Sequence, residues 1–173
     1  MEKLEHKLFP NDIDTTNIKI MQNCFINIWI EPYNLINTNK NYVFESCLPD
    51  AIYYFKKLEE EASPRKKFLY LNEIYNCIYN LGEFNEEKID GADSEIPLLN
   101  YVLIKAKPVN IYNNCRYMNL FLGDKKIRKE GNQLDTLKLL CEKMENFSYK
   151  DLFNITETDY EENKSLVLKG ILY

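Results

Sequence analysis

Residues 90–106 read DGADSEIPLLNYVLIKA, and this stretch predicts a helix with two different faces. At about 100° per residue, one wide arc suited to a core collects Ile96, Leu98, Leu99, Val102, Leu103 and Ala106. A narrower stripe carries Asp93, Pro97, Asn100, Tyr101 and Ile104. A carboxylate at the end of a half-apolar stripe suits a groove that receives a partner and presents a charge to it. The alternative is that both stripes are buried and that Asp93 only caps the helix.

Helical spacing of apolar residues continues through most of the chain. We expect further helices at about 14–29, 32–35, 47–61, 64–81, 111–122, 132–147, 149–153 and from 157 onward. Pro64 suits the first turn of a helix, Gly82 suits the end of that helix, and Pro108 should terminate the helix of the opening stretch. No segment alternates over the length of a strand. The sequence therefore predicts an all-α fold, a layered helical bundle that forms a single domain over residues 1–173.

Two of these helices carry predictions about which side chains face inward. The inner stripe of the first helix is expected to contain Ile18, Met21, Cys24, Phe25 and Ile28. Near the end of the chain, residues 164–173 are expected to dock through Leu166, Leu168, Ile171 and Leu172.

Composition excludes several classes of function. The formal net charge of −5 argues against a general nucleic-acid binder and does not favour an anionic membrane surface. The five cysteines are widely spaced without a CxxC pair, and His6 is the only histidine, so neither a zinc site nor a disulfide framework is expected. The thiols should stay reduced in the cytosol. No apolar run reaches the length of a membrane span, and no signal peptide is expected at the start of the sequence.

Motifs for covalent chemistry and for cofactor binding are missing from the sequence. There is no GxGxxG, GxxxxGK[ST], HExxH or GxSxG, and no imidazole is well placed to activate a serine or cysteine. Adjacent carboxylates such as Glu59/Glu60 and Glu161/Glu162 point apart on a helix, so we expect them to be surface charges. We therefore expect a protein without a cofactor or a metal, whose work is done by binding.

A longer pattern runs through residues 91–121. It contains, in order, Ala92-Asp93, Ile96-Pro97, Tyr101-Val102, Lys105-Ala106-Lys107-Pro108, Asn110-Ile111, Asn113-Asn114 and Tyr117-Met118-Asn119-Leu120-Phe121. Other pieces follow the same order along the chain, namely His6-Lys7-Leu8-Phe9, Trp29-Ile30-Glu31-Pro32-Tyr33-Asn34-Leu35, and Arg65-Lys66-Lys67-Phe68 with Ile74 and Ile78. Together they resemble the vacuolar-protein-sorting-nine (Vps-nine) domain over almost the whole chain, with the core of the motif at 65–147.

The resemblance implies guanine-nucleotide exchange on a Rab GTPase of the early endosome, in the Rab-five subfamily. It also implies a cytoplasmic protein that is recruited to endosomes. Members of the family receive the GTPase in a groove between two helices, and an aspartate reaches the nucleotide site. Asp93 matches that acid. Many members have two consecutive acids here, and the second is Ser94 in this chain, so Asp93 or Glu95 would serve if the second acid is the working one.

By the same resemblance, Pro97, Asn100, Tyr101 and Ile104 would line one wall of the groove. On the other wall the family usually shows Gly-Tyr-x-Leu-Thr, and this chain has Asn132 at the tyrosine position and Asp135 at the threonine position. These departures favour one alternative to an exchange factor, a degenerate domain that binds a Rab without exchange. A helical adaptor without a GTPase partner is a second alternative.

Overall fold

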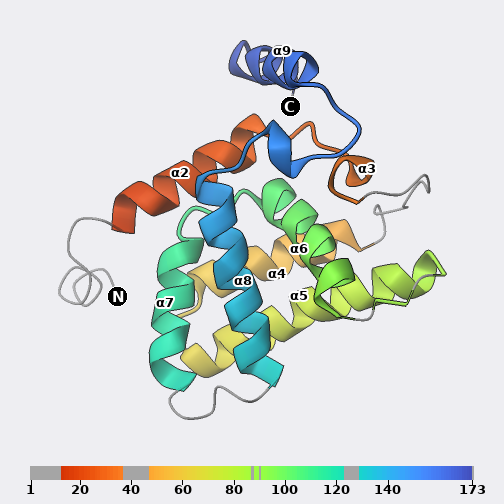
Figure 1. Cartoon of the computed structure of the whole chain (residues 1–173). Coiled ribbons are helices and arrows are strands. Elements are labelled where there is room, and N and C mark those ends of the chain that lie inside the picture. The colour runs from red at the N-terminus through yellow and green to blue at the C-terminus, as the bar shows by residue number, and fades with distance from the viewer. Residues whose placement is uncertain (1–12, 37–46, 87, 90, 123–128, 173) are drawn as a thin grey trace.

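The computed structural model describes residues 13–36, 47–86, 88–89, 91–122 and 129–172, and within this part of the chain it contains helices and no strands (Figure 1). The helices are α2 (Ile13–Ile26), α3 (Pro32–Leu35), α4 (Leu48–Glu60), α5 (Pro64–Phe84), α6 (Ala92–Ala106), α7 (Ile111–Leu122), α8 (Lys129–Glu145), the short 3₁₀ turn η2 (Tyr149–Asp151) and α9 (Glu157–Leu168). The predicted all-α bundle is confirmed. The expected opening match at His6-Lys7-Leu8-Phe9 lies outside the described residues.

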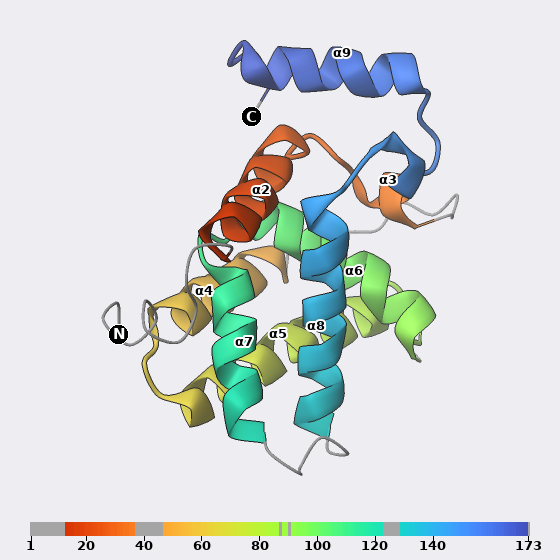
Figure 2. The same cartoon turned by 60° about the vertical axis from the view of Figure 1, so that its left-hand side comes forward.

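The bundle has a helical hairpin on one side and three helices packed across it. α4 and α5 form the hairpin, and α6, α7 and α8 lie over it, with α7 and α8 side by side (Figures 1 and 2). α2 crosses the ends of these helices, and α9 packs on α2. Among the described helices, α6 packs against the largest number of neighbours, namely α2, α3, α4, α5 and α8. It is therefore the central helix of the fold.

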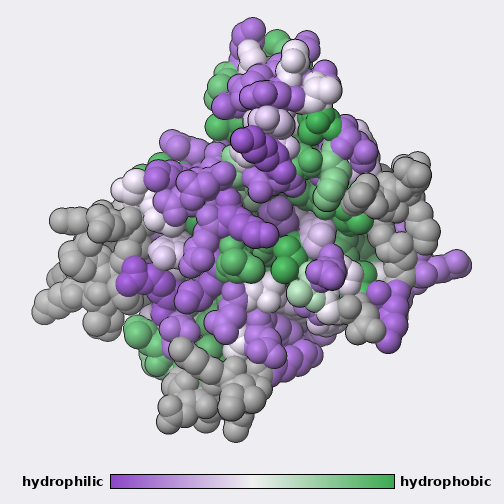
Figure 3. Space-filling view, in the orientation of Figure 1, coloured by the Kyte–Doolittle hydropathy of each residue, from purple (hydrophilic) through white to green (hydrophobic). Residues whose placement is uncertain are grey.

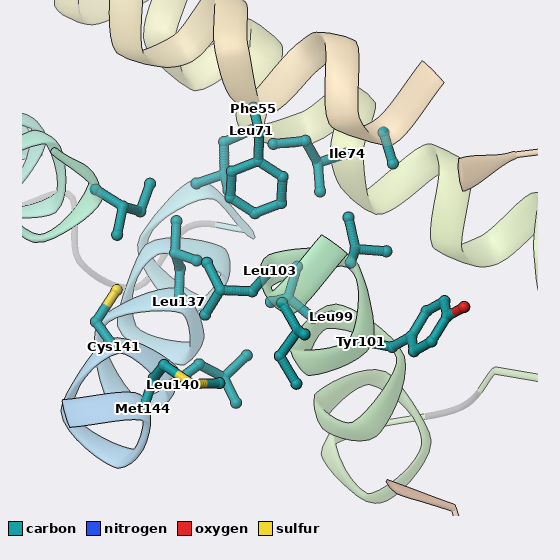
Figure 4. Close-up of a cluster of buried hydrophobic side chains, with 14 of the residues drawn as sticks. Phe55, Leu71, Ile74, Leu99, Tyr101, Leu103, Leu137, Leu140, Cys141 and Met144 are labelled. Atoms are coloured by element: carbon teal, nitrogen blue, oxygen red, sulfur yellow. The ribbon is translucent and has the colours of Figure 1, made fainter. Parts of the chain in front are cut away.

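The core forms where α5, α6 and α8 turn their apolar stripes toward each other. Leu99 and Leu103 of α6 point toward Leu137 and Leu140 of α8, with Phe55 of α4 nearby (Figure 4). Five apolar residues repeat every three to four positions over residues 132–147, and all five of them are buried, at Leu134, Leu137, Cys141, Met144 and Phe147. Burying side chains of this size contributes roughly 1.5–3 kcal/mol each, so this cluster is a major contributor to the stability of the domain.

The inward face of α2 differs from the prediction. Ile18 is 48% exposed and Phe25 is 43% exposed, while Asn17, Ile20, Cys24 and Asn27 are buried. The polar side chains on this face are used for hydrogen bonds: Asn17 Oδ1 accepts from the backbone N–H of Tyr112 at 3.0 Å. A buried amide that satisfies backbone groups is tolerated, so the apolar pattern alone misplaced the face by about one residue.

Three smaller predictions are also wrong. Gly82 does not end its helix, because α5 continues to Phe84 and Gly82 is buried within it. The tail docks less closely than expected, since Leu168 and Ile171 are more than 60% exposed, although Val167 is buried. Glu59 is not a surface charge: its carboxylate accepts hydrogen bonds from the backbone N–H groups of Val109 and Asn110. It thereby satisfies the otherwise unpaired donors that precede α7.

Candidate functional site

The first turn of α6 presents Asp93 to solvent. The helix begins after Gly91, which has φ +92° and provides no side-chain cap. Asp93 is exposed, and none of the residues that the structure describes forms a hydrogen bond or ion pair with its carboxylate. Asp93 is therefore not the N-cap of the helix, although a negative charge in the first turn is favoured by the helix dipole. Its carboxylate remains available to a partner.

The two neighbouring candidates for the acid are engaged within the domain. Ser94 Oγ donates a hydrogen bond to the carbonyl of Gly91 at 3.1 Å. Glu95 is half-buried, and its Oε1 accepts a hydrogen bond from the hydroxyl of Tyr79 on α5 at 2.8 Å. Of the three positions, Asp93 is the one with an accessible and uncommitted carboxylate.

A hollow of about 160 Å³ lies between α6 and α8. We call it the α6–α8 hollow, and its lining consists of Leu35, Ile96, Pro97, Asn100, Leu140, Lys143, Phe147 and Asp151. Pro97 and Asn100 share the face of α6 that carries Asp93, at spacings of four and seven residues. Apolar surface gathers where α6 and α8 meet, with hydrophilic side chains around it (Figure 3). The hollow therefore combines an apolar floor with charges at its rim.

Two residues predicted for this wall are placed elsewhere. Ile104 has no exposed surface and Tyr101 is 6% exposed, so both belong to the core. Tyr101 points away from Leu99 and Leu103 (Figure 4). Burial, and secondarily the charge of Glu31, raises the pKa of Tyr101 to about 12. The reason is the central position of α6: a helix with neighbours on most sides buries its second stripe as well as its first.

Asn132 and Asp135 are both exposed near the start of α8. They do not line the α6–α8 hollow, whose α8 residues are Leu140 and Lys143, further along the helix. The sequence interpretation missed Leu140 and Lys143, although their spacing of three residues places them on one side of α8. Asp135 and Lys143 place opposite charges along the accessible side of α8.

A second hollow, of about 860 Å³, lies at the other end of α8. Its lining comes from the start of α5, the end of α7 and the start of α8, and includes Phe68, Leu69 and Phe121. It contains none of the residues that the sequence predicts for the site. Volume alone therefore does not make it the better candidate, because two of the predicted residues, Pro97 and Asn100, line the smaller hollow and none lines this one.

Metal binding and membrane insertion find no support in the described residues. No group of three or more histidine, cysteine or acidic side chains is arranged to hold a metal ion there. Likewise, none of the helices within that part of the chain has the length and hydropathy needed to span a bilayer.

The family of the chain follows from comparison with known proteins. A sequence model of the vacuolar sorting protein 9 (VPS9) domain matches residues 48–154, which run from the start of α4 past η2. The chain belongs to the VPS9 domain family. The matched range contains Asp93, the three α6 residues of the hollow and both predicted α8 residues. α2, α3 and α9 lie outside the match.

Individual VPS9 proteins are similar over different shares of the chain. Vacuolar protein sorting-associated protein 9A of Oryza sativa subsp. japonica is 24% identical over 99% of this chain and 37% of its own length. The protein of the same name from Arabidopsis thaliana is 26% identical over 94% of this chain and 32% of its own length. GTPase-activating protein and VPS9 domain-containing protein 1 of Xenopus laevis is 30% identical over 52% of this chain and 6% of its own length. The chain thus spans about a third of the plant relatives and far less of the frog protein.

Proposed function

We propose that this VPS9 domain is a guanine-nucleotide exchange factor for a Rab GTPase of the Rab-five subfamily, and that Asp93 is the residue that acts on the nucleotide site. The observation that carries the proposal is the exposed Asp93 carboxylate in the first turn of α6, on the same helix face as Pro97 and Asn100 of the α6–α8 hollow. An apolar hollow beside a free acid suits a partner that needs both packing and charge.

The physical basis is competition for the groups that hold the nucleotide. Guanine nucleotides are held by Mg²⁺ and by a lysine of the GTPase phosphate loop. A carboxylate brought beside that lysine pairs with it and repels the β-phosphate, so the nucleotide and the metal are bound less tightly. By linkage, a factor that binds the nucleotide-free GTPase more tightly weakens nucleotide binding by the same factor. No bond is made or broken, which agrees with a sequence that lacks motifs for covalent chemistry.

Within this proposal, Pro97 and Asn100 contact the GTPase from α6, and Asn132 and Asp135 contact it from α8. Tyr101 and Ile104 act indirectly, because their burial holds α6 in place. The protein would work in the cytoplasm and be recruited to endosomes where its GTPase resides.

Release of a fluorescent GDP analogue from a panel of Rab-five subfamily GTPases tests the proposal. The parent chain should accelerate release, and Asp93→Ala should abolish the acceleration while the melting temperature stays within about 2 °C. Asp50→Ala is the matched control: Asp50 is likewise exposed in the first turn of a helix, α4, and does not line the hollow. Equal acceleration by the parent and Asp93→Ala would refute the role of Asp93.

A second candidate function is binding without exchange, and Asp135 favours it. The resemblance implies a neutral threonine at this position, and Asp135 instead places an exposed carboxylate on α8. Its negative charge would repel the phosphates of the nucleotide that the GTPase holds. Capture of the nucleotide-free GTPase on the immobilised chain, without faster GDP release, would select this function. Failure to capture any GTPase of the panel would leave the helical adaptor.

A further inference from the structure

Two tyrosines one turn apart on α5 reach both sides of the proposed site. Tyr79 donates a hydrogen bond from its hydroxyl to Oε1 of Glu95 on α6 at 2.8 Å. Tyr75 donates from its hydroxyl to the backbone carbonyl of Gln133 on α8 at 3.2 Å. The centroids of the two rings are 6.2 Å apart. We call this pair the tyrosine bracket.

The acceptors of the bracket are close in sequence to the residues proposed to meet the GTPase. Glu95 follows Asp93 by two residues, within the first turn of α6. Gln133 lies between Asn132 and Asp135 in α8. The spacing between the two tyrosines is fixed by α5, since residues four apart on a helix lie one turn from each other. The bracket therefore ties the start of α6 to the start of α8 through a single rigid element.

The start of α6 lacks a side-chain cap. Its N-cap is Gly91, which supplies no side-chain hydrogen bond, and the ends of helices tend to fray. A neutral hydroxyl that donates to an ionised carboxylate makes a stronger hydrogen bond than a neutral pair. Burial, followed by the hydrogen bond to Glu95, raises the pKa of Tyr79 to about 12, so the donor keeps its proton at neutral pH.

We propose that Tyr79 is a positioning residue that, through Glu95, holds the first turn of α6 and so fixes Asp93 relative to α8. Tyr75 holds the other side in the same way. The expected effect on the exchange rate rests on the proposed function. The expected effect on the position of the first turn of α6 rests only on the two hydrogen bonds. In well-oriented reactions a displacement of about 1 Å can lower a rate by roughly 100-fold, so loss of one restraint on Asp93 should be visible in the rate.

The activity test compares Tyr79→Phe with Glu95→Gln. Tyr79→Phe keeps the ring and removes the donor, and should lower the maximal rate of GDP release about 10-fold while the half-saturating concentration of the exchange factor stays the same. Glu95→Gln keeps an oxygen acceptor for the hydroxyl and should retain most of the rate. Tyr117→Phe is the control, since it removes a tyrosine hydroxyl that donates to Ala62 on the other side of the domain.

The structural test does not depend on exchange. Spin labels at Ala92→Cys and Lys129→Cys, with Cys47 and Cys77 replaced by serine, report the distance between the starts of α6 and α8. Tyr79→Phe should broaden that distance distribution, and Tyr117→Phe should leave it unchanged. If the parent accelerates GDP release and Tyr79→Phe accelerates it equally, the inference is overturned and the proposed function stands. A parent that never accelerates release overturns the proposed function, and the inference then stands or falls on whether the distribution broadens.

Discussion

Lys67 of α5 donates a hydrogen bond to Asn114 of α7 inside the domain, where the lysine has no exposed surface. Its ammonium also donates to the carbonyl of Leu58 at the end of α4, 2.6 Å away, and lies 5.9 Å from the centroid of the Tyr117 ring. A buried ammonium is tolerated only where hydrogen bonds compensate its lost hydration. Lys67 thereby connects α4, α5 and α7 inside the domain.

Replacement of Lys67 by methionine should destabilise the domain by about 2–4 kcal/mol, because the Leu58 carbonyl and the Asn114 amide oxygen lose a buried donor. Chemical denaturation measures this loss. Lys66→Met is the matched control, since Lys66 is exposed and makes only a long contact of 3.8 Å with Glu61. Equal stability of the two variants would show that the buried ammonium is not needed.

The adjacent carboxylates Glu59 and Glu60 should differ sharply in their contribution to stability. Glu59→Ala removes the acceptor for the two backbone N–H groups before α7 and should cost about 1–2 kcal/mol, as the loss of a helix cap does. Glu60→Ala loses only exposed contacts with Lys56 and Lys57, and should change the free energy of unfolding by less than about 0.5 kcal/mol. Thermal unfolding of both variants measures the contrast, which similar losses would contradict.

Cys24 should make the stability of the domain depend on alkaline pH. Burial, with a smaller contribution from Glu59, raises the pKa of this thiol from 9.0 to about 12. The folded state therefore holds a proton that the unfolded state loses above pH 9. This stabilisation is complete below pH 9 and is lost as the pH rises toward 12. Between pH 8 and pH 10 the parent should lose about 1.4 kcal/mol more than Cys24→Ala in urea denaturation. Parallel losses in the two proteins would contradict the shifted pKa.

Lys107 ends α6 in a left-handed conformation, with φ 47° and ψ 56°. Residues with a side chain are strained there, and glycine is not. Lys107→Gly should therefore raise the melting temperature, with a gain of about 0.5–1 kcal/mol. Lys107→Ala keeps a Cβ atom and should give no such gain, so a similar increase in both variants would assign the effect to lost charge instead.

Asn132→Tyr, which introduces the residue that the family resemblance implies at this position of α8, should strengthen the proposed interaction. Asn132→Tyr places an aromatic side chain at an exposed position beside a proposed GTPase contact, and such anchors contribute about 2 kcal/mol or more at interfaces. The affinity for the nucleotide-free GTPase should rise at least about 10-fold in a binding titration. Gln22→Tyr, on the exposed side of α2, controls for the aromatic group itself. If Asn132→Tyr does not increase the affinity, residue 132 does not belong to the surface that contacts the GTPase.

Most helices of the bundle were predictable from sequence because their apolar stripes are regular. The stripe of α8 and the boundaries of α7 follow directly from spacing. The buried faces of α2 and α6 did not follow from the spacing of apolar residues, for opposite reasons. α2 buries Asn17 and Asn27, which periodicity counts as polar, and α6 buries Tyr101 and Ile104 because five helices surround it.

The placement of Asp93, Pro97 and Asn100 on one face of α6 was predictable from sequence, but the contacts that support this face were not. Asp93, Pro97 and Asn100 follow from the spacing and the family resemblance. Lys143 and Tyr79 were not predicted, because their roles depend on which helices become neighbours. For Lys67 a signal was available: the buried stripe of α5, when extended back from Leu71 by one turn, falls on this lysine. The other supporting contacts depend on which helices pack together in the folded domain, and no local sequence pattern indicates that.

The number of neighbours around α6 has a mechanical consequence for the proposed exchange. Pressing a carboxylate against a bound nucleotide meets resistance, and the force acts equally on both proteins. The body of α6 packs against α2, α3, α4, α5 and α8 and therefore resists displacement, and the hydrogen bond from Tyr79 to Glu95 extends this support to the first turn. In the proposed exchange, the GTPase would therefore have to be the partner that deforms.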